Sequence, residues 1–236
     1  MSQGGALSPK NKAQKVAVRT KEEDKAIRQI AKKTANLKKE QLRIINANGE
    51  VVLEKKGEKG EVSSTVGEHR KAFWDKGGTI AIHNHPAGGT FSDMDLNEFG
   101  YGAKEIVVSA PEGTYRLVKT TNGIPDWVSL RDKVREIPEQ SLATLMKEAR
   151  KIADNSVVGK RLKEFSVGWT EVFQKYGKDE ANARYPKEEY DRMSEQYKEI
   201  VESERRKLEV KPYDEVYKKY AQKYGMRYIF EPWKKK

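Results

Sequence analysis

The sequence of 236 residues contains no cysteine and only three histidines. The absence of cysteine excludes disulfide bonds, thiolate metal sites and a cysteine nucleophile. No run of about 18 apolar residues occurs, so we expect no membrane-spanning helix. The first residues also lack the basic and then apolar pattern of a secretory signal. We therefore expect a polar, soluble protein of the cytoplasm.

Charge is distributed unevenly along the chain. The net charge of +11 is made up of +7 in residues 1–40, −2 in residues 41–130 and +6 in residues 131–236. Basic flanks of this kind are typical of proteins that bind an acidic partner, and we expect any nucleic-acid contacts at residues 10–39 and in the C-terminal helices. Solvated helix faces and a mobile tail would give the same composition. The middle of the chain is chemically distinct from both flanks.

Local patterns predict a small α/β region after a polar N-terminal arm. Residues 1–20 hold almost no large apolar side chain and predict a disordered basic arm. Asn48-Gly49 between two apolar runs predicts a hairpin of strands at 41–47 and 50–55. Further expected elements are a helix at 21–37, a helix at 67–76, a strand at 79–82, a helix from Ser92, strands at 105–109 and 114–118, and a connector from Pro125.

Long polar helices follow in the last third of the chain. We predict helices at 139–154, 157–176, 187–208 and 213–224, the last two separated by Pro212, and a final strand after Gly225. The many tyrosines of this region can pack between helices or stack on bases, and helical spacing favours packing. The predicted division is an arm at 1–20, an α/β domain at 21–130 and a helical basic region at 131–236.

Two of the three histidines stand in one short stretch at the end of a predicted strand. Residues i and i+2 of a strand point the same way, so His83 and His85 can present their rings to one point. Pro86 and the glycines at 88–89 turn the chain, and Asp95 follows ten residues later. Two nitrogens and one carboxylate oxygen leave the fourth position of a zinc ion open, as in catalytic sites. We therefore predict Zn²⁺ at this point, where a bound water would have a pKa near ~7.

A hydrolytic zinc site also needs a carboxylate that accepts the proton of the attacking water. The candidates are Glu40, Glu50, Glu54, Glu58, Glu61 and Glu68. Glu40 is favoured because it stands at the start of the first predicted strand, where the sheet would fix its position. Glu50 and Glu54 stay open as alternatives, since they lie on the adjacent strand.

Two further polar residues have more than one interpretation. Ser92 can donate a hydrogen bond to a developing oxyanion, or it can cap the helix that we expect after it. His69, between a glutamate and an arginine on a predicted helix, is interpreted as a solvated residue without a role.

Taken together, these residues resemble the motif of the JAMM (JAB/MPN) zinc metalloproteases. The resemblance rests on Glu40, His83-x-His85-Pro86, Ser92-x-x-Asp95 and the stretch Glu105–Leu117. The sequence His83-Asn84-His85-Pro86 is similar to that of the prokaryotic branch, which includes RadC-like proteins. It is most similar to JAMM-like domains of bacteriophage proteins, which are often attached to head-morphogenesis proteins. The resemblance is specific over 40–118. The segment between His85 and Asp95 is slightly shorter than in the eukaryotic deubiquitinase members.

The resemblance implies roles for these residues and a fold. His83, His85 and Asp95 would bind zinc, Glu40 would be the general base and Ser92 the oxyanion stabiliser. The implied fold is a mixed α/β sandwich, the JAMM/cytidine-deaminase-like mixed sheet flanked by helices, followed here by a predominantly helical C-terminal region. Family members cleave peptide or isopeptide bonds, and some have lost the metal and serve as scaffolds.

Three functions follow as expectations. The first is a zinc-dependent peptidase or isopeptidase of phage type with a polypeptide substrate. The second is a non-enzymatic virion or DNA-packaging protein that contacts phage structural proteins and nucleic acid, which would place the chain in the virion. The third is a metal-dependent toxin.

Overall fold

The computed structural model describes residues 16–57, 64–86, 88–121 and 125–233. Most of the expected N-terminal arm, with Lys10, Lys12 and Lys15, and two of the candidate bases, Glu58 and Glu61, lie outside the described residues. The described chain forms a six-stranded mixed sheet flanked by helices and a helical region. The α/β prediction is confirmed at this level.

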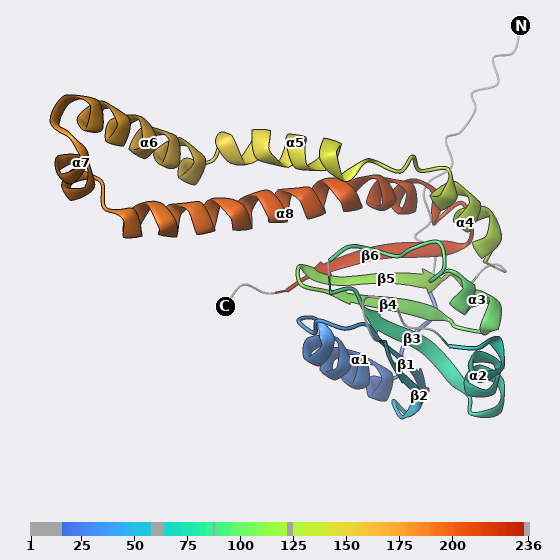
Figure 1. The fold of residues 1–236 in the computed structure, drawn as a ribbon. Helices are drawn as coiled ribbons and strands as arrows, with labels where there is room; N and C mark the ends of the chain where they lie inside the picture. The colour runs from blue at the N-terminus through green and yellow to red at the C-terminus, as the bar shows by residue number, and fades with distance from the viewer. Residues whose placement is uncertain (1–15, 58–63, 87, 122–124, 234–236) are drawn as a thin grey trace, which may run out of the picture. The chain divides into compact units, whose positions relative to one another are not determined.

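The sheet unit holds eleven elements (Figure 1). They are α1 (Lys21–Thr34), β1 (Gln41–Asn46), β2 (Val51–Lys56), α2 (Val66–Arg70), the π-helical turn η1 (Lys71–Asp75), β3 (Gly78–Asn84), α3 (Asn97–Tyr101), β4 (Glu105–Ala110), β5 (Gly113–Lys119), α4 (Trp127–Arg135) and β6 (Met226–Pro232). The strand order is β2-β1-β3-β4-β5-β6. β3 pairs with β4 in parallel and the other neighbours are antiparallel.

The first hairpin forms where the sequence predicts it. Gly49 has a φ of 77°, which glycine adopts without a steric cost. The side-chain oxygen of Asn46 accepts hydrogen bonds from the backbone N–H groups of Asn48 and Glu50. The turn residues therefore fix the register of β1 and β2.

Helices cover both faces of the sheet. One face carries a buried cluster with α1, made up of Ile27, Ile45, Ile80, Ile82 and Val107. Side chains alternate along a strand, so His83 points to the opposite face. On that face η1 packs against β3 and α3 packs against β4. This alternation places the predicted metal ligand in the layer between the sheet and the short helices.

A buried carboxylate attaches the start of α1 to the sheet. Glu23 is fully buried and accepts hydrogen bonds from the backbone N–H of Thr20, the hydroxyl of Thr79 and the ammonium of Lys104, at 2.5–2.7 Å. Burial alone would raise the pKa of Glu23, but these partners outweigh it and lower the pKa below the ordinary value of 4.5. The ionised form is therefore the one that stabilises the fold.

Replacing Glu23 with Gln should lower the free energy of unfolding at pH 7 by about 2 kcal/mol, since charged hydrogen bonds are lost. The stabilisation by Glu23 is complete above the unfolded pKa near 4.5 and is lost as the pH falls through the lower folded pKa. Urea unfolding of both proteins at pH 7 and pH 3 tests this, because the difference should shrink in acid. Glu22→Gln, on the exposed side of α1, is the control and should change stability little. A difference between Glu23→Gln and wild type that does not depend on pH would contradict the assignment.

The helical unit differs from the prediction in two details. It contains α5 (Leu142–Asp154), α6 (Val157–Tyr176), α7 (Lys178–Arg184) and most of α8 (Lys187–Tyr220). α8 continues through Pro212, so the predicted interruption is wrong. A proline removes one backbone donor, and a helix of 34 residues keeps enough other hydrogen bonds to continue. The sequence analysis also missed α7. Outside this unit it missed α4, which begins at Trp127 within the expected connector from Pro125.

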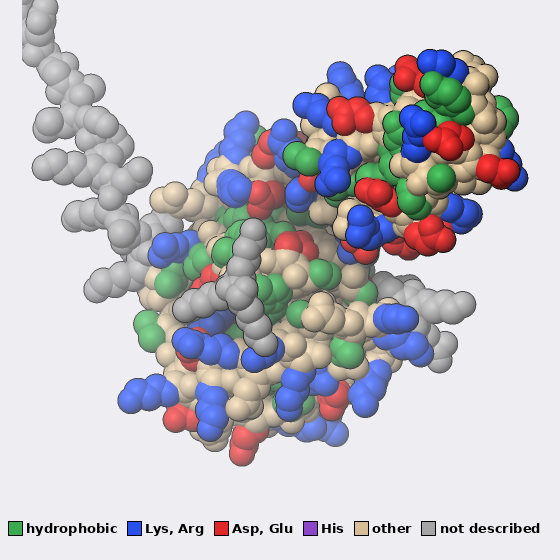
Figure 2. Space-filling model, turned by 90° about the vertical axis from the view of Figure 1, so that its left-hand side faces the viewer, with side chains coloured by type: hydrophobic (Ala, Val, Ile, Leu, Met, Phe, Trp, Pro, Cys, Tyr) green, Lys and Arg blue, Asp and Glu red, His purple; other side chains and the backbone are tan. Residues whose placement is uncertain are grey.

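Ion pairs run along the surface of α8. Arg205 pairs with Glu202 and Glu209, and Arg206 pairs with Glu202. Figure 2 shows basic and acidic side chains interspersed over the face of the molecule that it displays. Part of the basic charge of this region is therefore balanced within its own helix. Among the described residues, no helix combines the length and apolarity needed to cross a membrane.

The end of the chain returns to the sheet. β6 pairs with β5 along its whole length, and the described residues from Val216 on belong to the sheet unit. The structure thus divides the chain differently from the expected boundary at residue 130, because the last strand is supplied from the far end of the sequence. Tyr217 and Tyr228 stack at 5.5 Å in this segment, so here the tyrosines pack as the helical spacing favoured.

Candidate metal centre

The two histidines are positioned by the central parallel strands. His83 is paired with Leu42 of β1 and Val108 of β4, and it is buried. Just beyond the strand, the backbone N–H of His85 donates to the carbonyl of Ser109 at 2.9 Å, which extends the parallel pairing. Both rings are therefore held by backbone hydrogen bonds of the sheet and point the same way.

The third member comes from the crossover between β3 and β4. Gly88 and Gly89 have φ values of 85° and 107°. Residues that carry a side chain rarely adopt such values, so the two glycines allow the chain to turn after Pro86. Asp95 lies in a turn before α3. Its carboxylate accepts from the backbone N–H of Ser92 at 2.6 Å, and its own N–H donates to the Ser92 hydroxyl oxygen at 3.3 Å. The expected helix from Ser92 thus begins only at Asn97, because these reciprocal bonds form a turn first.

The C-terminal segment supports this turn. The hydroxyl of Tyr217, a fully buried residue of α8, donates to the carbonyls of Phe91 and Ser92 at 3.3 and 3.4 Å. The rings of Phe91 and Tyr217 also meet edge to face at 5.5 Å. The loop that carries Asp95 is therefore fixed from a position 125 residues further along the chain.

The donor atoms of the cluster have the spacing of a metal site. His83 Nε2 lies 3.1 Å from His85 Nε2 and 3.2 Å from Asp95 Oδ1, and His85 Nε2 lies 3.7 Å from Asp95 Oδ2. In a tetrahedral zinc site with bonds of about 2.0–2.2 Å, neighbouring donors lie about 3.3–3.6 Å apart. The three side chains can therefore bind one ion without large movement, and two histidines with one carboxylate are a donor set that Zn²⁺ or Fe²⁺ accepts.

A positive charge is electrostatically favourable within the cluster. Burial opposes protonation of His83, but the Asp95 carboxylate outweighs it and, with smaller contributions from Glu98 and Glu40, raises the pKa of His83. Burial would raise the pKa of Asp95, yet His83, His85 and the N–H of Ser92 hold that pKa well below its usual range. A proton on His83 supplies the charge without metal, and a divalent cation satisfies the same need once the ligands are deprotonated.

A pocket of about 250 Å³ adjoins the cluster. Glu40, His83 and Asp95 all line it, so the favoured base and two of the predicted ligands share one space. Among its described lining residues none is Lys or Arg. The pocket is consequently acidic, although the chain as a whole is basic.

The alternative bases on the first hairpin lie elsewhere. Glu50 accepts a hydrogen bond from Asn46 at 2.8 Å, and Glu54 pairs with Arg43 at 2.7 Å. Neither lines the pocket, whereas Glu40, directly before β1, does. Among the candidate bases that the structure describes, Glu40 alone lines the pocket, and its role as base stays a prediction.

Ser92 stabilises the turn that precedes α3. Its hydroxyl oxygen accepts from the N–H of Asp95, and it is not among the residues that line the pocket. The interpretation of Ser92 as a helix cap is wrong, because the residue at the N-cap of α3 is Leu96. The expected oxyanion contact stays a prediction.

The interpretation of His69 as a solvated residue is wrong. His69 is only 5% exposed, and its ring packs at a tilt against that of Tyr101, with the ring centroids 4.7 Å apart. Its Nδ1 lies 3.0 Å from Glu98 Oε2, and its Nε2 is in very close contact with the hydroxyl of Ser64. The capping box between Thr65 and Glu68 sets the rotation of α2 and turns His69 inward, away from the surface. The capping box that begins at Thr65 could have suggested that His69 points inward. No local pattern indicates that Glu98 is its partner.

Known proteins offer no further guide to this centre, since no family model, curated protein or solved structure matches the chain. Its chemistry is indicated by the cluster His83, His85 and Asp95, whose spacing suits one metal ion.

Proposed function

We propose that the protein is a zinc-dependent hydrolase of amide bonds, a peptidase or isopeptidase of the JAMM type. The observation that carries the proposal is the set of three side chains whose donor atoms lie 3.1–3.7 Å apart, beside a pocket that Glu40 also lines. The arrangement in the sheet supports the JAMM/cytidine-deaminase-like fold as part of the proposal. Glu40 precedes the first strand, the histidines end the central strand, and Asp95 follows in the crossover.

The residues of the pocket divide the chemistry among them. Zn²⁺ bound there would polarise a substrate carbonyl and lower the pKa of a water in its open position. The Glu40 carboxylate accepts a proton from the attacking water and delivers it to the nitrogen of the leaving amine. A carbon–oxygen bond forms, the carbon–nitrogen bond breaks, and Glu40 returns to its ionised form. The expected phage origin, nucleic-acid contacts and location stay predictions from the sequence.

Purified full-length protein should contain one zinc per chain by elemental analysis, and it should cleave a library of fluorogenic peptides or an isopeptide-linked substrate. Removal of the metal with a chelator should stop cleavage, and one equivalent of Zn²⁺ should restore it. Iron in place of zinc would contradict the zinc assignment. Protein that binds no metal although all three side chains are intact would contradict the whole proposal.

A further inference from the structure

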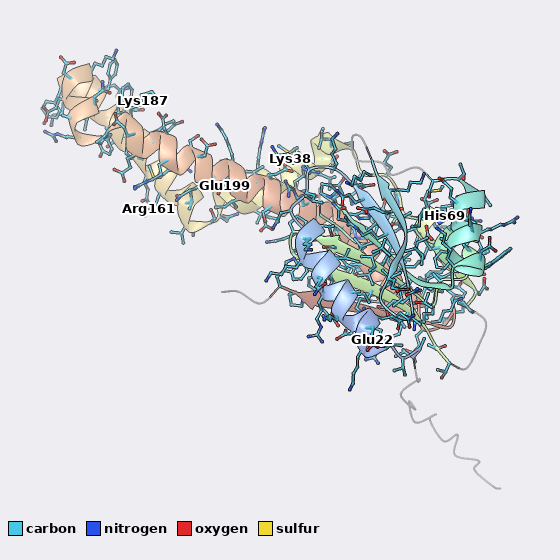
Figure 3. The ribbon with its side chains drawn as sticks, turned by 90° about the horizontal axis from the view of Figure 1, so that it is seen from below. Glu22, Lys38, His69, Arg161, Lys187 and Glu199 are labelled. Atoms are coloured by element: carbon cyan, nitrogen blue, oxygen red, sulfur yellow. The ribbon has the colours of Figure 1, made fainter. Side chains whose placement is uncertain are left out.

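A second group of reactive side chains lines the same pocket. Ser64, His69 and Glu98 all contribute to its wall. His69 projects from α2 beside the sheet (Figure 3), whereas Glu98 comes from α3. The three are joined in a row, from the Ser64 hydroxyl to Nε2 of His69 and from Nδ1 of His69 to the Glu98 carboxylate. None of these side chains belongs to the metal cluster.

The geometry indicates which ring nitrogen of His69 donates a hydrogen bond and which one accepts. A carboxylate can only accept, so the 3.0 Å contact with Glu98 places the proton of a neutral ring on Nδ1. The lone pair of Nε2 then faces the hydroxyl of Ser64 and accepts its proton in a hydrogen bond. The ring of Tyr101 packs at a tilt against the ring of His69, and the side chains of His69 and Glu98 are only 7% and 11% exposed.

A purely structural role does not account for Ser64. The N-terminus of α2 is already capped by Thr65, whose hydroxyl accepts the N–H of Glu68. Ser64 is half-buried at the pocket wall, where a molecule in the pocket would meet it. A serine hydroxyl whose proton is accepted by a histidine, itself oriented by a carboxylate, is the arrangement that activates serine as a nucleophile.

We propose that Ser64 is a nucleophile for acyl transfer, with His69 as its general base and Glu98 as the residue that positions His69. This reactive centre does not require a metal. Among the described lining residues Glu40 and Asp95 add negative charge and no Lys or Arg balances it, so the matching substrates are neutral or cationic esters.

The reaction balances with water as the second substrate. Ser64 Oγ forms a bond to the carbonyl carbon, its proton passes to His69 Nε2, and that proton leaves with the alcohol as the carbon–oxygen bond of the ester breaks. Water then attacks the acyl-serine and gives a proton to His69. The acid departs, and the proton on His69 returns to Ser64.

A fluorophosphonate probe tests the nucleophile without knowledge of the substrate. Ser64 Oγ would form a bond to phosphorus, fluoride would leave, and the proton would pass to His69. The full chain is treated with the probe in the presence of a chelator, and the modified peptide is identified by mass spectrometry. We expect one adduct, on Ser64, at a rate that zinc removal does not abolish. Lack of an adduct on Ser64 would overturn the proposal.

Variants separate activation from simple exposure. Ser64→Ala should lose the adduct, and His69→Gln should slow its formation by about 100-fold or more, as expected for loss of a general base. Ser166→Ala, an exposed serine of α6, is the control and should be labelled like wild type. Labelling of folded His69→Gln at the wild-type rate would overturn the proposal.

Nitrogen NMR of the histidine ring tests the positioning role of Glu98. In wild type and in Ser64→Ala the proton of His69 should reside on Nδ1, and in Glu98→Gln the population should shift toward Nε2, since an amide can donate to Nδ1. An unchanged tautomer together with unchanged labelling would overturn the role of Glu98. The peptide-cleavage assay with zinc is independent of both results, so either proposal can fail alone.

Discussion

Replacing Asp95 with Asn should remove the metal from the protein. The carboxylate of Asp95 faces Nε2 of both His83 and His85, and it supplies the negative charge of the cluster. An amide has the same shape without that charge. Loss of an outer-shell partner alone costs about 10–100-fold in metal affinity, so loss of this ligand should cost more than about 100-fold. Elemental analysis after dialysis should fall from one zinc per chain to a small fraction, and a competition titration with a chromophoric chelator gives the affinity.

The backbone bonds of the turn make this variant interpretable. An asparagine oxygen can still accept the N–H of Ser92, so the turn before α3 should persist. Asp93→Asn, two residues away in the same turn, is the matched control. If it lost as much zinc as Asp95→Asn, or if Asp95→Asn kept the wild-type affinity, the assignment of Asp95 would be wrong.

Replacing Glu40 with Gln should slow cleavage strongly and leave the zinc in place. Glutamine keeps the size of the side chain but cannot accept the proton of the attacking water. General-base catalysis contributes about 10²–10⁴-fold, and kcat should fall within that range while the metal content stays at one per chain. The measurement is turnover of the best substrate, with metal content determined on the same preparation.

Glu54→Gln is the control, because Glu54 follows on the adjacent strand and pairs with Arg43 outside the pocket. It should keep nearly full activity. A larger loss of activity in Glu54→Gln than in Glu40→Gln would indicate that Glu54 on β2 is the general base. Loss of zinc from Glu40→Gln would instead make Glu40 a ligand.

The grouping of His83, His85 and Asp95 could be predicted because these residues are close in sequence. His83 and His85 are two residues apart on a strand, and the period of a strand alone places both rings on one side. The hairpin at Asn48-Gly49 is local in the same sense. Glycines and a proline then indicate a turn, and Asp95 lies within reach of it.

The second cluster could not be predicted because its partners are distant. Glu98 lies 29 residues beyond His69, and it is brought there by the parallel pairing of β3 and β4, which no local pattern encodes. The contacts of Tyr217 with Phe91 and Ser92 depend in the same way on β6 returning to the sheet. Local propensity was also misleading at Pro212, where the other hydrogen bonds of a 34-residue helix outweighed one missing hydrogen bond.

The support that Tyr217 gives to the ligand loop has a consequence for the order of synthesis. During translation, His83, His85 and Asp95 are added to the chain long before Tyr217 and the strand β6. During that interval the nascent chain holds all three ligands, but the carbonyls of Phe91 and Ser92 lack their partner hydroxyl. The turn that carries Asp95 therefore gains its hydrogen bonds to Tyr217 only after that residue has been synthesised. Prematurely terminated chains would carry the histidines without a finished site.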